Sequence, residues 1–545
     1  MTTAPADRLD SWKQIAAYLH RSVRTVRRWE HEEGLPVHRH VHRTLASVYA
    51  LKSEVDAWRQ AAARAPESSR AAASSATTAP TRSIAVLPFA NLSADPENEY
   101  FADGLTDEVT TTLAKVRDLR VTSRLSSMTL RGTSKGAKAI SAQLGVRYLL
   151  EGSVRRAGQR LRVTAQLIDA ANDNHLWADT YDGTVDDVFS IQEQLARVIV
   201  DALELRLTAR EKQRIAERAI DNLPAYECYL RARHEAWRWR RDSIDHAVQL
   251  LREGLAIIGD NVRLHAALGV AYLQYREAGI DFGDRPLLEA EKCASKLFEL
   301  ERDSSAGLQL RGWIRYSRGL VQEAVHDLKA ALDIEPNNAD TLLLLSNCYL
   351  ISGRVSSARP LVTRLLAVDP LTPVTRCMPA WADILDGKFA AALEPYRQMV
   401  EMDPSNPMAR LFYTWVLVIN HMEHDVGALV DECPSDVRDT VPARIAFFLA
   451  FALAGKHGEA QAVLTPQVEA AARATDVFAR FLAHGFALAG MAERAMRWLE
   501  VAVDRGFINY PFLARHDPVF RLLRSEARFK RLLEVVRDRW ERFET

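Results

Sequence analysis

A 34-residue spacing recurs in the C-terminal part of the chain and constrains its fold more than any other feature. Three residue types keep one register, in the series Gly319, Gly353, Gly387, Ala324, Ala358, Ala392, Pro336, Pro370 and Pro404. A unit of this length suits two antiparallel helices: the glycine makes the turn between them, the alanine lets them approach closely, and the proline stops the second. Because one such unit cannot bury its own apolar face, the period predicts a stack of helix pairs.

This pattern resembles the tetratricopeptide repeat, from about Leu223 to Thr545 and most clearly from Ser317 to Pro407. By length we expect roughly seven to nine units. The resemblance implies an α-solenoid whose superhelical groove binds a peptide or protein partner. We expect most Trp, Tyr and Leu side chains of the repeats to pack between helices, and charged residues such as Arg354, Lys388 and Arg397 to be solvated.

A change of composition separates a small N-terminal head from the rest. The segment from Ala61 to Arg82 is rich in Ala, Ser, Thr and Pro and lacks large apolar residues, which is typical of a flexible linker. Lys plus Arg and Asp plus Glu both number 71 in the whole chain, so any attraction to nucleic acid must be local. The head has a basic excess, with ten Lys or Arg against seven Asp or Glu.

Two short helices are predicted in the head. Asp10 or Ser11 is placed to cap the first, which carries the apolar residues Ile15, Ala16 and Leu19. Ser22 is placed to cap the second, in which Val26 and Trp29 face the first helix. The outward side of the second helix is then formed by Arg24, Thr25, Arg27 and Arg28. This is a helix-turn-helix pattern with basic side chains where a major-groove reader uses them.

A basic ribbon at residues 37–43 and a second short strand at residues 47–51 imply a wing. The head resembles the winged helix-turn-helix of the MerR and phage excisionase group, whose S-x-x-T-[LV]-R-R-[YW]-E core is matched by Ser22, Thr25, Val26, Arg27, Arg28, Trp29 and Glu30. At the turn, where a glycine is usual, the chain has His20. The resemblance implies binding of double-stranded DNA through Ser22, Arg24, Thr25, Arg27, Arg28, Arg39 and Arg43.

Two alternatives apply to the head. An exposed Arg-rich helix also suits an adaptor that binds protein. His38, His40 and His42 alternate on one predicted strand and offer three imidazoles, but no Cys or acidic fourth ligand is near in sequence, so we expect a solvated wing and no metal. Because a single head of this size binds DNA weakly, a homodimer is considered, formed by a helix predicted from Asp187 to about Ile220 or by the repeats.

The middle of the chain alternates between strand and helix patterns, which predicts an α/β layer. A β-rich run at 83–89 is followed by a helix at 100–115, a strand at 119–122 and a short helix at 137–144. Three further β-rich runs at 148–155, 160–169 and 175–181 predict an antiparallel meander.

Four segments of this region, at residues 83–89, 91–93, 100–108 and 144–155, resemble the TolB N-terminal-like (FlgO-like) domain. In bacteria that domain often stands between a DNA-binding head and tetratricopeptide repeats, and the resemblance carries over no active site. Asp103, Asp107 and Glu108 offer three carboxylates, but we interpret them as charges favoured near a helix N-terminus.

Several classes of protein are disfavoured. The five cysteines are widely spaced and odd in number, which argues against a disulfide framework or a Cys-rich zinc site and favours a reducing compartment. The nucleotide-binding, zinc-protease and serine-hydrolase motifs are absent from the sequence. Apolar stretches fall short of the ~18–20 residues that span a bilayer, and the N-terminus does not resemble a secretory signal. We therefore expect no cofactor, no membrane contact and a cytoplasmic location.

The sequence thus predicts a multidomain, mainly α protein. Its parts are a winged helix-turn-helix DNA-binding domain at 1–60, a flexible linker at 61–82, a TolB-like α/β domain with a mixed sheet at 83–205, a connecting helix at 206–222 and a tetratricopeptide-repeat solenoid at 223–545. The predicted function is that of a bacterial, DNA-binding, transcription-regulating protein and not an enzyme, with a protein partner bound by the repeats. The alternative is a protein-interaction scaffold that does not bind DNA, and an enzyme with an unrecognised site is a third class.

Overall fold

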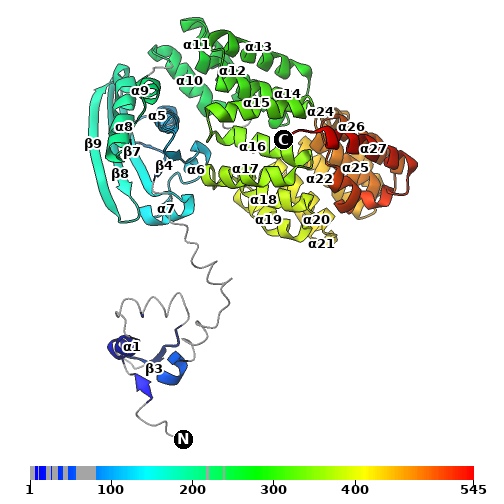
Figure 1. The fold of residues 1–545 in the computed structure, drawn as a ribbon, viewed down its shortest axis with the longest axis horizontal. Coiled ribbons are helices and arrows are strands. Elements are labelled where there is room, and N and C mark those ends of the chain that lie inside the picture. The colour runs from blue at the N-terminus through cyan, green and yellow to red at the C-terminus, as the bar shows by residue number, and fades with distance from the viewer. Residues whose placement is uncertain are drawn as a thin grey trace. The chain divides into compact units, whose positions relative to one another are not determined.

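The computed structural model divides the chain into two compact units, Met1–Thr78 and Ala79–Thr545, shown in Figure 1. The structure describes residues 7–9, 11–19, 26, 35–40, 47–56, 82–205, 207–216, 220–236 and 240–545. Within these ranges, none of the helices has the length and apolar character needed to cross a bilayer.

The first unit contains a small three-stranded sheet and a helix. β3 (Ser47–Leu51) pairs antiparallel with both β1 (Arg8–Leu9) and β2 (His38–His40). Helix α1 (Trp12–Tyr18) begins after Ser11, whose hydroxyl accepts a hydrogen bond from the Gln14 amide at 3.2 Å, so of the two predicted residues it is Ser11 that caps the helix. The unit's apolar core is formed by Leu9, Ile15, Ala16, Leu19, Val26, Leu35, Ala50 and Val55.

The second unit begins with a mixed six-stranded sheet in the order β6-β4-β7-β8-β9, with β5 paired to β7. The parallel strands are β4 (Ser83–Val86), β5 (Ala90–Asn91), β6 (Arg120–Val121) and β7 (Tyr148–Ala157). β8 (Arg160–Asp169) and β9 (Asn174–Thr184) continue from β7 as the predicted antiparallel meander. The mixed sheet of the sequence prediction is therefore confirmed.

Helices cover both faces of this sheet. On one face α5 (Glu99–Ala114), which follows the turn η1 (Pro96–Asn98), and α8 (Val188–Ala202), which follows η2 (Val185–Asp187), share a core with the strands. On the other face lies α7 (Ala137–Leu144), whose bounds match the prediction, and the short α6 (Arg124–Met128) comes before it. The core beside α5 continues without interruption into the first repeats.

One long helix from Asp187 to Ile220 was predicted, and this prediction is wrong. α8 ends at Ala202, and a separate helix α9 (Ala209–Ala216) follows. Glu204 has a φ of 50°, a left-handed conformation that interrupts an α-helix. Thr208 and Glu211 then form a capping box at the start of α9, in which each side chain accepts a hydrogen bond from the other residue's amide. Because the apolar stripe of α8 is buried in the core with the sheet, it is not free to form a dimer.

Eight helix pairs follow, and Figure 1 shows them continuing away from the sheet. The first helices of the pairs are α10 (Leu223–Ala236), α12 (Val262–Glu277), α14 (Ser305–Ser317), α16 (Ala339–Ile351), α18 (Pro373–Leu385), α20 (Pro407–Ile419), α22 (Val441–Leu453) and α25 (Asp476–Leu488). The second helices are α11 (Arg241–Ile258), α13 (Asp284–Leu300), α15 (Val321–Ile334), α17 (Val355–Val368), α19 (Leu393–Met402), α21 (Glu423–Asp431), α23 (His457–Ala462) and α26 (Ala492–Asp504).

The periodic residues have the predicted roles in these pairs. Gly319, Gly353 and Gly387 have φ values of 81°, 71° and 81°, the left-handed conformation that glycine adopts most easily. Ala324, Ala358 and Ala392 are fully buried between helices. The repeat prediction is therefore confirmed at the level of the fold.

Three additions complete the array. The turn η3 (Phe389–Ala392) precedes α19, and helix α24 (Pro466–Ala474) stands between the last two pairs. After α26 come η4 (Phe512–His516), which is a single π-helical turn, η5 (Phe520–Leu523) and a final helix α27 (Ala527–Arg542).

Gly104 lies where α5 meets α10, and a Cβ there would overlap the side chain of Leu230. We expect Gly104→Ala to lower the free energy of unfolding by about 1–3 kcal/mol, because one extra carbon in a packed interface displaces side chains or backbone. Urea titration followed by circular dichroism measures the change. Gly427→Ala is the control, since Gly427 is exposed on α21 and has open space around it. Gly427→Ala should raise the free energy of unfolding by about 0.5–1 kcal/mol, because alanine favours a helix over glycine. Equal changes at both sites would contradict the prediction.

Candidate functional site

Most of the predicted DNA-binding residues lie outside the described residues. These are Ser22, Arg24, Thr25, Arg27, Arg28 and Arg43. Arg39 is in β2, paired with Val48 of β3, but its side chain is also outside the description. The predicted assignment of these residues to DNA therefore stays a prediction.

The described part of the head agrees with the predicted packing. Val26 is fully buried, so this residue of the predicted second helix faces the core as expected. β2 and β3 pair as an antiparallel ribbon, with His38 opposite Tyr49. Glu54 lies 2.7 Å from His38, so an acidic residue does approach the histidine strand, although sequence distance gave no sign of it. Among the described residues, no group of three or more His, Cys, Asp or Glu is arranged to hold a metal ion.

The three carboxylates of α5 join the α/β part to the repeats. Asp103 accepts a hydrogen bond from Arg131 and lies 3.2 Å from His234 Nδ1. Asp107 lies 2.9 Å from Arg233 Nη2. Arg233 and His234 belong to α10, so these contacts cross from the sheet domain to the first repeat.

Glu108 completes this group of ion pairs. It pairs with Arg263 of α12, and burial raises the pKa of Glu108 although Arg263 favours its charged form. The interpretation of the three carboxylates of α5 as helix N-terminal charges is wrong, because α5 begins at Glu99 and Asp107 lies two turns inside it. Instead the carboxylates are buried and paired with cations from other elements, so they are not available as an open catalytic group.

A second polar joint links the two parts at Asp369, which follows α17. Its Oδ1 accepts hydrogen bonds from the hydroxyls of Ser123 and Ser126, the latter at 2.6 Å. Thr372 and Thr375 donate to the same carboxylate, each at 2.7 Å. Because Ser123 caps α6, this joint fixes the start of that helix to a turn of the repeats.

The repeats curve until their last pair contacts the earlier ones. Asp476 at the start of α25 faces Tyr316 of α14, and Phe478 packs on Phe282 with ring centroids 5.9 Å apart. Arg480 of α25 reaches Trp381 of α18. We call the surface formed by the first helices α14, α16, α18 and α20 the inner face. This is the surface that tetratricopeptide-like arrays present as a groove.

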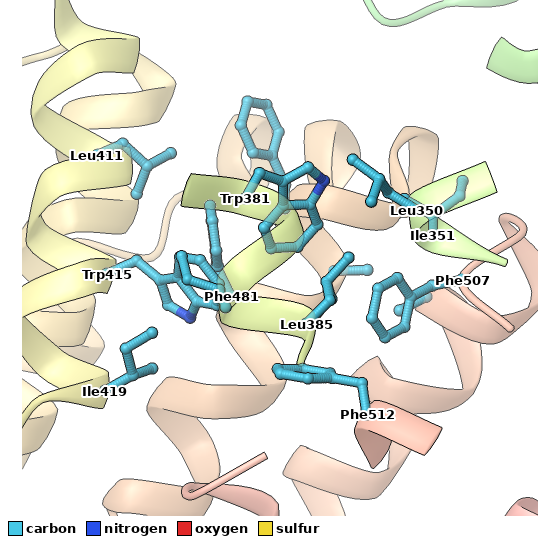
Figure 2. Packing of buried hydrophobic residues seen from close by; sticks show 14 of the residues in the cluster. Leu350, Ile351, Trp381, Leu385, Leu411, Trp415, Ile419, Phe481, Phe507 and Phe512 are labelled. Atoms are coloured by element: carbon cyan, nitrogen blue, oxygen red, sulfur yellow. The ribbon is translucent and has the colours of Figure 1, made fainter. Parts of the chain in front are cut away.

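Three residues at the same position of successive repeats form a row along the inner face. Asn347, Trp381 and Trp415 are 34 residues apart on successive first helices. The indole of Trp381 donates to Asn347 at 3.3 Å and packs edge-on against Trp415 with centroids 5.7 Å apart. Figure 2 shows Trp381, Trp415 and Phe481 meeting at the centre of this packing. Sequence reasoning missed this row, although the 34-residue period contained the signal.

Arg480 is the charged centre of the filled inner face. It is 1% exposed and its guanidinium lies over four rings, at 4.8 Å from Trp381, 5.2 Å from Trp415, 5.4 Å from Phe481 and 4.6 Å from Phe507. Such cation–π contacts stabilise a cation that has lost its water. Burial raises the pKa of Asp476, one turn earlier, to about 6.

A buried Trp–His–Asp chain lies one further turn along α25. The Trp415 indole donates to His484 Nδ1 at 2.9 Å, and His484 Nε2 lies 2.8 Å from Asp517 Oδ2. An indole nitrogen can only donate, so Nδ1 carries no proton and the neutral imidazole donates from Nε2 to the carboxylate. Asp517 and His484 are fully buried, which excludes this chain as an open acid–base site.

The C-terminal segment, residues 505–545, lies over the turns of three repeats. A Cβ at Gly319, Gly353 or Gly387 would approach Arg505, Trp540 or His516 within 3 Å. In Figure 1 the C-terminus returns to the middle of the array, where the Glu544 amide donates to Gln322 at 2.9 Å.

The expectation that Arg354 is solvated is wrong. It donates to the carbonyls of Trp540 and Phe543 at 2.6 and 2.8 Å and lies 4.7 Å over the Trp540 ring. Lys388, one repeat later, is 63% exposed, and Arg397 pairs only with exposed Glu394 and Glu401, as expected for solvated residues.

Two family models match parts of the chain. A tetratricopeptide-repeat model matches residues 316–374, and a model described as the second domain of HilA/YgeH-like transcriptional regulators matches residues 80–198. The repeats are therefore like tetratricopeptide repeats. The middle region carries a regulator-type match where the sequence suggested a TolB-like domain.

Curated relatives match over a minor part of their length. A protein of Rhizobium meliloti (strain 1021) named "Putative adenylate cyclase 3" is 42% identical over 191 residues, which are 35% of this chain and 32% of that protein. "Transcriptional regulator HilA" of Salmonella typhimurium is 24% identical over 153 residues, 28% of this chain and 27% of that protein. Among solved structures, a thermophilic tetratricopeptide-repeat protein of Thermus thermophilus has a TM-score of 0.29 at 19% identity, covering 34% of this chain and 97% of its own.

Proposed function

We propose that this protein is a DNA-binding regulator of transcription whose repeats bind a protein partner. The observation that carries the proposal is the sequence pattern of Arg24, Arg27 and Arg28, followed by the paired β2–β3 ribbon and joined in one chain to a region that matches a transcriptional-regulator domain. Val26, the described residue of the predicted second helix, is buried in the head core, as that pattern requires. The contacts around Asp107 and Asp369 make the α/β part and the repeats one connected body.

The second candidate is a scaffold without DNA binding. The relative named as an adenylate cyclase favours this second candidate. The chain matches that relative and the relative named as a transcriptional regulator over about a third or less of each relative's length, and the two names describe different activities. Such a shared stretch does not carry the activity of the longer protein. The DNA assignment therefore depends on the head, and an experiment on the head separates the two candidates.

Titration of labelled duplex DNA with the full chain over a salt series tests the proposal. We expect the affinity for DNA to fall as salt rises. The slope of log affinity against log salt concentration should become shallower by roughly 0.9 for each phosphate contact that the triple variant Arg24→Ala, Arg27→Ala, Arg28→Ala removes. The control replaces three solvated arginines of the repeats, Arg397, Arg473 and Arg542, with alanine. Absence of binding at low salt, or equal loss in both triple variants, would favour the scaffold.

A further inference from the structure

α25, the first helix of the last pair, packs on α22, α24 and α26 and reaches the inner face through side chains of one side. Its residues Asp476, Arg480 and His484 are four residues apart and so lie on one side of the helix. Each contacts an earlier first helix: Asp476 faces Tyr316, Arg480 covers Trp381, and His484 accepts from Trp415. Binding of a helix through side chains spaced four residues apart is a known form of peptide recognition.

This contact leaves buried polar atoms without partners. Arg480 Nε and Nη1 and Asp476 Oδ2 are inaccessible to water and make no hydrogen bond. A buried polar group that loses water without gaining a partner opposes the closed arrangement. The rings around Arg480 offset part of that cost but do not replace the missing hydrogen bonds. Of the four rings, Trp381 and Trp415 belong to the inner face, so the inner face contacts this guanidinium without satisfying its hydrogen bonds.

The C-terminal segment contacts both α25 and the ends of earlier first helices. On α25, Asp517 lies 2.8 Å from His484, and the Arg480 guanidinium lies 4.6 Å over the Phe507 ring. Asn509 donates to the Leu350 carbonyl at 2.9 Å, and the amide of Ile508 donates to the carbonyl of Ile351 at 3.1 Å. Arg354 binds the two carbonyls at the end of α27. The contacts with Leu350, Ile351 and Arg354 join residues distant in sequence and lie at the end of a first helix or its turn.

We propose that α25 is an internal competitor for the protein partner of the repeats, and that this partner presents a helix with an arginine one turn after an acidic residue. The partner enters the inner face when the C-terminal segment leaves the turns. The proposal rests on the partner-binding half of the proposed function. It is independent of the head, because no residue in this contact belongs to the DNA-binding pattern.

The test uses the full chain and two variants at the same repeat position. Arg354→Ala removes the contacts to the end of α27, whereas Lys388→Ala, one period later, removes only an exposed pair with Asp383. Hydrogen exchange read by mass spectrometry should accelerate about tenfold in α25 and α27 of Arg354→Ala, with α10–α13 unchanged and Lys388→Ala like the unmodified chain. Circular dichroism confirms that both variants fold.

A labelled synthetic peptide of residues 474–490 then probes the opened face. We expect its apparent affinity for Arg354→Ala to exceed that for the unmodified chain by about tenfold, because the open fraction rises by that factor. The same peptide with Arg480→Gln should not gain. Exchange that accelerates equally in α10–α13, or does not accelerate, would show that α25 is an inseparable part of the array and overturn the proposal. A peptide that gains nothing, or gains equally without its arginine, would overturn the assigned partner. The DNA titration is unaffected by either result.

Discussion

Replacing His484 with alanine is expected to lower the free energy of unfolding of the second unit by about 3–5 kcal/mol. The imidazole accepts from Trp415 and donates to Asp517, and both partners are buried. Its loss leaves an indole N–H without an acceptor and a carboxylate oxygen without its donor. Asp517 keeps the amides of Val519 and Phe520 on its other oxygen, so the charge is only partly compensated. A cavity among aromatic rings adds to the cost.

Urea unfolding followed through tryptophan fluorescence measures this effect, because Trp415 itself contacts His484. His457→Ala is the matched control: His457 is exposed on α23, where the same substitution should change stability by no more than ~0.5 kcal/mol. If both variants unfold at the same urea concentration, the Trp–His–Asp chain contributes little, and the tautomer assigned to His484 loses its support.

The repeat architecture could be predicted because its signals are local. Glycine at a turn, alanine at a crossing and proline after a helix act through their own backbone and nearest neighbours, and a fixed period repeats those local effects. A helix near Ala137–Leu144 was predicted and is present, and Gly145, with a φ of 64°, ends it by the same kind of local effect. Strand alternation likewise located β7 and β8 to within a few residues.

The closed inner face could not be predicted in this way. Whether Arg480 meets Trp381 depends on the small rotation between successive pairs, summed over several repeats, and no single residue determines that sum. Arg354 and Lys388 occupy the same repeat position and look alike in sequence, yet only Arg354 meets the end of α27. Their difference arises from a segment far along the chain.

The acidic residues of α5 illustrate a second limit. Sequence reasoning interpreted Asp103 and Asp107 as charges near a helix start, favoured by the helix dipole. The structure buries them because Arg131, Arg233 and His234 arrive from other elements. Partners supplied by tertiary contacts are invisible to a local pattern. For the head, the DNA contacts assigned to Arg24 and its neighbours stay a prediction.

Asp369 is where the α/β part depends most on a single residue of the repeats. It is 2% exposed and receives four hydroxyl donors, from Ser123, Ser126, Thr372 and Thr375. The amide of Ser123 also donates to the Val368 carbonyl at 2.8 Å, so backbone and side chain act at the same place. Together with the ion pairs of α5, this joint supplies polar contacts between the sheet domain and the repeats.

Asp369→Ala is therefore expected to cost about 3–5 kcal/mol, because four buried hydroxyls lose their acceptor together. Hydrogen exchange should accelerate most in α6 and in the turn after α17, and urea unfolding gives the total. Asp403 supplies the control, since it stands one 34-residue period later before the next periodic proline, is exposed, and accepts from Ser405 alone among side chains of the described residues. Asp403→Ala should stay within ~0.5 kcal/mol of the unmodified chain. If Asp369→Ala behaves like Asp403→Ala, the two parts are held by the α5 ion pairs and the apolar core, and the joint at Asp369 is not required to couple them.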